Sequence, residues 1–98
     1  MEEKVPTAKQ LLGGYNAAKD SVWVVESSID RLTSETNDGE KLEIKGNIER
    51  NVGHLKIVVA NQHMIDSGHD LTILQAAIDA GTACLESTTW PEPPEEEE

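Results

Sequence analysis

A heptad pattern of apolar residues in the first third of the chain most constrains its fold. The apolar positions are spaced alternately by four and three residues, at Leu11, Tyr15, Ala18, Val22, Val25, Ile29 and Leu32. Such a stripe follows one face of an α-helix and is typical of a helix that packs lengthwise against another. We therefore predict a long helix over residues 8–35, with Thr7 as its N-cap.

The heptad stripe has two possible partners. It packs on other helices of its own chain, or it pairs with a second copy of the chain and makes the protein oligomeric. In the second case the stripe is an interaction face, for which the candidate residues are Leu11, Tyr15, Val22, Val25, Ile29 and Leu32. The sequence leaves both alternatives open.

Two further segments show helical periodicity. A helix over residues 47–65 would place Ile48, Val52, Leu55 and Val59 on one face. A helix over residues 71–86 would do the same for Leu71, Leu74, Ala77, Ile78 and Leu85, with Gly81 in the slot between Ile78 and Leu85. Small residues there would let this last helix pack closely against a neighbour. The expected fold is all-α, an antiparallel three-helix bundle.

The domain organisation follows from composition. We expect one helical domain over residues 7–90, between a flexible N-terminus, residues 1–6, and a disordered Pro/Glu tail, residues 91–98. Trp90, directly before the tail, is expected to fold back on the bundle.

Local β-branched runs support a fallback fold. Residues 21–25 and 55–59 are rich in valine and isoleucine, which favour extended chain. Residues 41–45 alternate apolar and charged side chains, as a short strand would. The fallback is therefore an α+β fold with a short strand pair over residues 22–25 and 55–59. The heptad register favours helices over this alternative.

The charge balance excludes several classes of partner. The chain has 8 basic and 19 acidic residues, a net charge of −11, and five of the acids lie in residues 91–98. Nucleic acids and anionic membranes both attract basic surfaces, so we expect neither as a direct partner. No apolar run reaches the roughly 20 residues of a membrane span. The N-terminus lacks a signal-peptide pattern, and the lone Cys84 suits a reducing compartment or a virion.

The segment NQHMIDSGHD, residues 61–70, is the strongest candidate for a chemical site. His63, Asp66 and His69 carry groups that bind metals or transfer protons. However, Gly68 stands where a helix end needs a positive φ, and Asp70 stands where a following helix needs a cap. The segment is therefore predicted to be a corner between helices, with a metal site on His63, Asp66 and His69 as the alternative.

Catalytic and cofactor motifs are missing from the sequence. There is no phosphate-binding loop, EF-hand loop or nucleophile elbow, and Cys84 has no histidine near it in sequence. We therefore predict a protein that is not an enzyme and needs no cofactor. The acidic tail suggests an alternative role as a DNA-mimic-like inhibitor of a host nucleic-acid-binding protein. The alternation of acids and bases over residues 40–50 weakens that alternative.

Three stretches resemble a known group of proteins. Residues 47–55 (NIERNVGHL), 66–71 (DSGHDL) and 75–83 (QAAIDAGTA) are similar to small uncharacterised helical proteins of tailed bacteriophages and prophages. The resemblance implies a location in the host cytoplasm or the virion and a non-enzymatic role, and it carries no functional residue across. The expected function is a protein-interaction or structural module, acting on a protein partner or by self-association.

Overall fold

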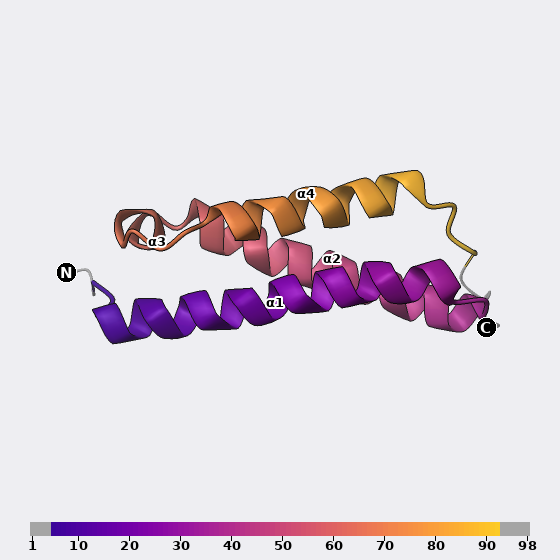
Figure 1. Cartoon of the computed structure of the whole chain (residues 1–98), viewed down its shortest axis with the longest axis horizontal. Helices are drawn as coiled ribbons and strands as arrows, with labels where there is room; N and C mark the ends of the chain where they lie inside the picture. Colours follow the sequence, from indigo (N-terminus) through magenta and orange to yellow (C-terminus); the bar gives the residue numbers. More distant parts are fainter. Residues whose placement is uncertain (1–4, 93–98) are drawn as a thin grey trace, which may run out of the picture.

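Three long helices and one short helix make up the protein. The computed structural model describes residues 5–92. Its helices are α1 (Ala8–Ser34), α2 (Asp38–Ala60), α3 (Gln62–Asp66) and α4 (Thr72–Ser87). α1 and α4 run in one direction and α2 returns in the other, with α3 at the turn between α2 and α4 (Figure 1). The all-α bundle expected from the sequence is confirmed, with α3 as an addition.

Capping residues explain where the first two helices begin. Thr7 accepts a hydrogen bond from the backbone N–H of Gln10, whose side chain accepts one from the backbone N–H of Thr7, which forms a capping box. Asn37 accepts a hydrogen bond from the Glu40 backbone N–H and so starts α2. The predicted start at residue 47 was wrong, and so was a strand over residues 41–45. The Asn37 cap, followed by acidic side chains in the first turn, favours helix from residue 38 onward.

The fallback strand pair was also wrong. Residues 22–25 lie in α1 and residues 55–59 lie in α2, and the structure shows no strand within residues 5–92. Val25 and Leu55 are fully buried on the inner faces of these helices. Burial of a helical apolar stripe therefore outweighs the weaker preference of β-branched residues for extended chain.

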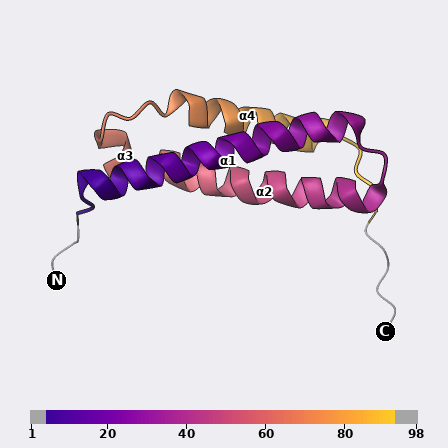
Figure 2. The same ribbon diagram turned by 60° about the horizontal axis from the view of Figure 1, so that its bottom comes forward.

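The core lies where the three long helices meet. Figure 2 shows α1 and α2 side by side along their length. α2 supplies Ile44, Ile48, Val52 and Leu55, and the other helices add Tyr15, Ala18, Val25, Met64, Leu74, Ala77 and Ile78. The aliphatic content of this core follows directly from a sequence that has three aromatic residues and no phenylalanine.

Gly81 determines how closely α4 approaches the other two helices. A Cβ atom at this position would lie 2.5 Å from Cγ2 of Val52, 3.2 Å from Cγ1 of Val25 and 3.3 Å from Cγ2 of Ile48. The space that a side chain would need is therefore taken by residues of α1 and α2. The close packing expected around Gly81 is confirmed.

Trp90 ties the segment that directly follows α4 to the bundle. Its indole Nε1 donates a hydrogen bond to the carbonyl oxygen of Leu85, at 3.0 Å. The ammonium nitrogen of Lys45, on α2, lies 6.0 Å from the centroid of the Trp90 ring. This contact joins Trp90 to α2. The predicted return of Trp90 to the bundle is confirmed. Most of the predicted flexible N-terminus (residues 1–4) and of the predicted Pro/Glu tail (residues 93–98) lies outside the described residues.

Candidate functional site

Residues 61–70 form a corner between helices. α2 ends at Ala60 instead of the predicted residue 65, because Asn61 is extended and its side chain accepts a hydrogen bond from the Met64 backbone N–H, which starts α3. Gly68 has φ of +83°, as expected for the residue that reverses the chain after a helix. The corner predicted from the sequence is confirmed, with an extra helical turn inside it.

Asp70 stabilises the start of α4 from the position before the N-cap. The N-cap residue is Leu71, but the Asp70 carboxylate still accepts a hydrogen bond from the Thr72 backbone N–H, at 2.9 Å. The hydrogen bonds from Thr72 hold the pKa of Asp70 below its ordinary value. The prediction of Asp70 as the N-cap was therefore wrong, although its carboxylate accepts a hydrogen bond from the first residue of α4.

The three candidate metal ligands have separate surroundings. The Asp66 carboxylate accepts a hydrogen bond from the Gln62 side chain, and His63 is exposed. His69 stacks on the ring of Tyr15, with centroids 4.6 Å apart, while the Tyr15 hydroxyl donates to the Asp70 carbonyl oxygen at 2.7 Å. Within residues 5–92, no three acidic, histidine or cysteine side chains lie close enough together to hold a metal ion. The stacking of His69 on Tyr15 packs the corner onto α1.

The heptad face of α1 packs inside the chain. Tyr15 and Val25 are buried in the core, and the remaining candidates, Leu11, Val22, Ile29 and Leu32, are partly buried against it. A partner approaching α1 would therefore meet only the edges of this stripe. The surface that α1 leaves free lies on its outer flanks.

A serine and a histidine meet between α1 and α2, and no pattern in the sequence predicted this pair. Ser21 Oγ lies 2.8 Å from His54 Nδ1. Such a pair is the first requirement of a serine nucleophile with its base. Ser21, however, is only 6% exposed and faces the core, so a substrate has no access to its hydroxyl. The pair joins the two helices. Its residues are 33 positions apart in the sequence and meet only because α1 and α2 pack antiparallel.

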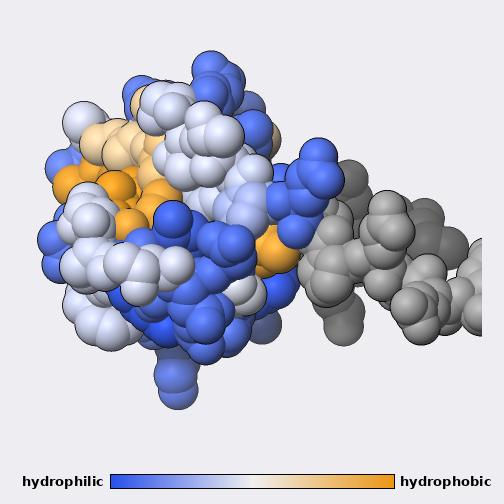
Figure 3. All heavy atoms as spheres, turned by 90° about the vertical axis from the view of Figure 1, so that its right-hand side faces the viewer, coloured by the Kyte–Doolittle hydropathy of each residue, from blue (hydrophilic) through white to orange (hydrophobic). Residues whose placement is uncertain are grey.

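An apolar groove lies between α1 and α4. It has a volume of about 320 Å³, is open to solvent, and is lined by Val22, Glu26, Ile73, Ala76, Ala77 and Ala80. The end-on view of Figure 3 shows apolar atoms gathered at the left of the body, on the face that Figure 1 turns toward the reader. Its volume lies at the lower end of the range for pockets that hold small ligands, about 300–1,000 Å³.

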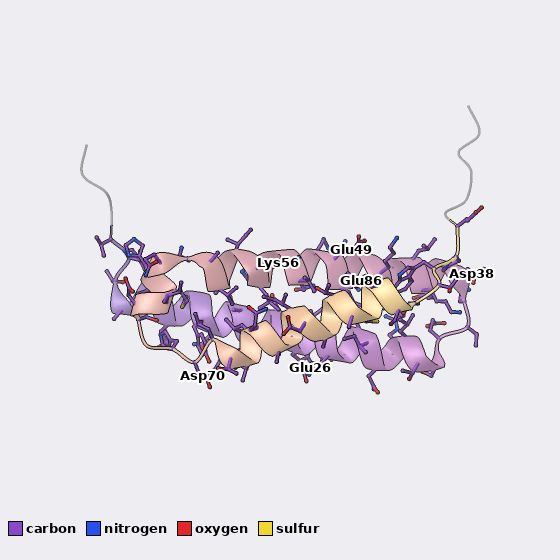
Figure 4. The ribbon with its side chains drawn as sticks, turned by 90° about the horizontal axis from the view of Figure 1, so that it is seen from above. Glu26, Asp38, Glu49, Lys56, Asp70 and Glu86 are labelled. Atoms are coloured by element: carbon purple, nitrogen blue, oxygen red, sulfur yellow. The ribbon has the colours of Figure 1, made fainter. Side chains whose placement is uncertain are left out.

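The groove carries a one-sided charge. Glu26 is the one charged residue among the six that line it, and α4 contains Asp79 and Glu86 but no lysine or arginine. In Figure 4, Glu26 lies on the α1 side of the boundary with α4, whereas Glu49 and Lys56 lie along α2. α1 and α2 each contain acids and bases in equal number, so the excess negative charge of the chain comes from the residues outside these two helices.

Trp23 stands on the outer face of α1 close to this groove. It is 70% exposed, and it lies three residues from Glu26, which places both side chains on neighbouring parts of the same helical face. Trp23 also borders a second hollow, shared with Val24, Ser27, Ser28, Arg31 and Asn47, toward α2. The β-branched run over residues 21–25 left strand and helix as alternatives, and its pattern did not indicate that the Trp23 indole is exposed.

No family model, curated protein or solved structure gave a significant match to the chain. Within residues 5–92, no helix has both the length and the apolar character needed to cross a membrane.

Proposed function

We propose that the chain is a non-catalytic protein-interaction module, which binds a partner protein through the outer face of α1 and its border with α4. The observation that carries this proposal is Trp23, which is 70% exposed at the middle of the longest helix. Tryptophan contributes heavily to binding energy at protein interfaces when a partner covers it. The hollows on either side of the outer face of α1 can accept side chains of a partner.

The rest of the molecule supports binding over catalysis. The polar side chains that meet between helices, such as Ser21 with His54 and Arg31 with Glu40, join structural elements to one another. At the corner, Asp70 accepts a hydrogen bond from the Thr72 backbone N–H, Asp66 accepts one from the Gln62 side chain, and His69 stacks on Tyr15. These contacts occupy Asp66 and His69, two of the three residues that the sequence marked as candidates for chemistry, whereas His63 is exposed.

A paired substitution tests this function. Tagged wild-type protein and the variants Trp23→Ala and Ile57→Ala would be used to capture proteins from the host cell. Ile57 is the matched control, because it is also 70% exposed but lies on α2. A partner retained by wild type and Ile57→Ala, lost with Trp23→Ala, and then bound as a purified protein supports the proposal. A partner set unchanged by Trp23→Ala contradicts it.

The bacteriophage resemblance is part of the same proposal. A module of this kind in a phage acts in the host cytoplasm or in the virion. The genes that flank its coding sequence would distinguish these roles, because capsid or tail genes imply a virion part and early genes imply a factor directed at the host. Neighbouring genes of cellular metabolism would contradict a phage origin.

A further inference from the structure

We infer that the groove between α1 and α4 docks a basic amphipathic helix of the partner protein. This inference rests on the proposed function and names the kind of partner. The groove is defined by Val22, Glu26, Ile73, Ala76, Ala77 and Ala80. Its floor, its direction and its charge each point to this occupant.

The floor of the groove is made of small apolar side chains that the chain itself leaves uncovered. Ala76 and Ala80 are exposed, and Ile73 keeps 42% of its surface exposed. The opposite exposed flank of α4 is polar, with Gln75 hydrogen-bonded to Asp79. Alanines allow the backbone of another helix to come close, and an isoleucine at the edge offers it an apolar contact.

The direction of the groove fits a helix. Ile73, Ala76 and Ala80 recur at spacings of three and four along α4, and Val22 and Glu26 lie one turn apart along α1. The floor residues on α4 thus extend over about 10 Å, or two helical turns. On the other side of the α1–α4 pair, α2 fills the equivalent position with a row of branched side chains, so a second helix with a similar row matches the open side.

The charge selects a basic partner helix. Glu26 is the sole charged group lining the groove, and the chain carries a net charge of −11. Lysine or arginine side chains flanking an apolar stripe would lie beside Glu26 and be drawn to the groove by the surrounding negative potential. A second copy of this chain would bring the same negative charge and be repelled. Trp23, next to Glu26 on α1, adds an aromatic face for such a cation.

Designed peptides test the inference directly. The probe is a fluorescently labelled 18-residue helical peptide, designed with a leucine stripe and lysines on the other face, whose binding to the full chain is measured by fluorescence anisotropy. A peptide with glutamate in place of every lysine is its matched control. We expect the lysine peptide to bind and the glutamate peptide to bind at least tenfold more weakly, with an affinity that falls as salt rises. Equal binding of both peptides would overturn the role of charge.

Two variants with the same change of charge locate the site. Ala76→Lys places a cation in the groove, and Gln75→Lys places one on the polar flank of the same helix. Both positions are exposed and helical, and thermal unfolding followed by circular dichroism checks that both variants fold. We expect Ala76→Lys to weaken binding of the lysine peptide at least tenfold and Gln75→Lys to change it by less than threefold. Equal effects would show attraction to the whole acidic surface and overturn the groove as the site.

The remaining outcomes separate this inference from the function on which it rests. Light scattering that gives a dimer, dissociated by Ala76→Lys, would assign the groove to a second copy and overturn the basic helix. If Trp23→Ala loses a cellular partner that Ala76→Lys retains, the chain is an interaction module but the groove is not its site. If neither variant loses a partner, the proposed function itself fails.

Discussion

α2 and α4 both pack on α1, but they are held there by different means. Between α1 and α2, polar side chains pair across the boundary: Ser21 with His54 at 2.8 Å and Arg31 with Glu40 at 2.6 Å. α4 packs closely because Gly81 has no side chain. In the segment that leads into α4, the Asp70 backbone carbonyl accepts a hydrogen bond from the hydroxyl of Tyr15 on α1. One helix is aligned by specific pairs and the other by shape. The boundary formed by shape is also the one that leaves an open groove.

Filling the space at Gly81 should have the largest effect. Gly81→Val would drive methyl groups into Val25, Ile48 and Val52, and we expect the free energy of unfolding to fall by about 3 kcal/mol because the core has no room to relax. Urea unfolding measures it. Gly13→Ala is the control, because a Cβ there meets nothing within 4 Å, and it should stabilise the protein by about 1 kcal/mol through helix propensity. A neutral Gly81→Val would show that α4 is not packed as described.

Removing the polar pair between α1 and α2 should cost less. Ser21→Ala removes the buried hydroxyl that pairs with His54, and we expect a loss of about 1 kcal/mol in unfolding free energy. Ser27→Ala, on the outward side of α1, is the matched control and should change stability by less than about 0.5 kcal/mol. A double-mutant cycle with His54→Ala measures the coupling, and a coupling of zero would remove the pair from the account of how α2 is aligned.

The ion pair at the other end of the α1–α2 boundary should contribute least. The Arg31 and Glu40 side chains are about half exposed, at 51% and 43%, so solvent screens their attraction. A double-mutant cycle with Arg31→Ala and Glu40→Ala should give a coupling of about 0.5 kcal/mol that vanishes in 1 M salt. A coupling above that of Ser21 and His54 would reverse the ranking of the two contacts.

The start of α4 should give a pH-dependent contribution. Hydrogen bonds from Thr72 lower the pKa of Asp70 in the folded state, so its stabilising effect is present above its ordinary value of 3.8 and is lost as the pH falls through the lowered pKa. Wild type should therefore exceed Asp70→Asn in stability at pH 6, and the difference should shrink as the pH falls below about 4. An NMR titration that places the pKa of Asp70 at or above its ordinary value would contradict this.

The sequence by itself determined the features that depend on near neighbours in the chain. The heptad of α1 with its Thr7 cap, the positive φ of Gly68 and the slot at Gly81 follow from periodicity, capping and the steric freedom of glycine. The negative net charge is likewise a property of composition. These features were enough to predict an all-α bundle and a helical corner over residues 61–70, although α2 began at Asp38 and ended at Ala60 because asparagine caps outweighed the local pattern.

Only the tertiary structure decided which side chains meet across helices. The pairing of Ser21 with His54, the stacking of His69 on Tyr15 and the groove beside Glu26 depend on how each helix is rotated about its axis and shifted along its neighbour. Periodicity identifies the buried face of a helix, but it does not say which neighbour covers each edge of that face. The groove therefore became visible only once α4 was placed on α1, because Gly81 sets how close and at what rotation the two helices lie.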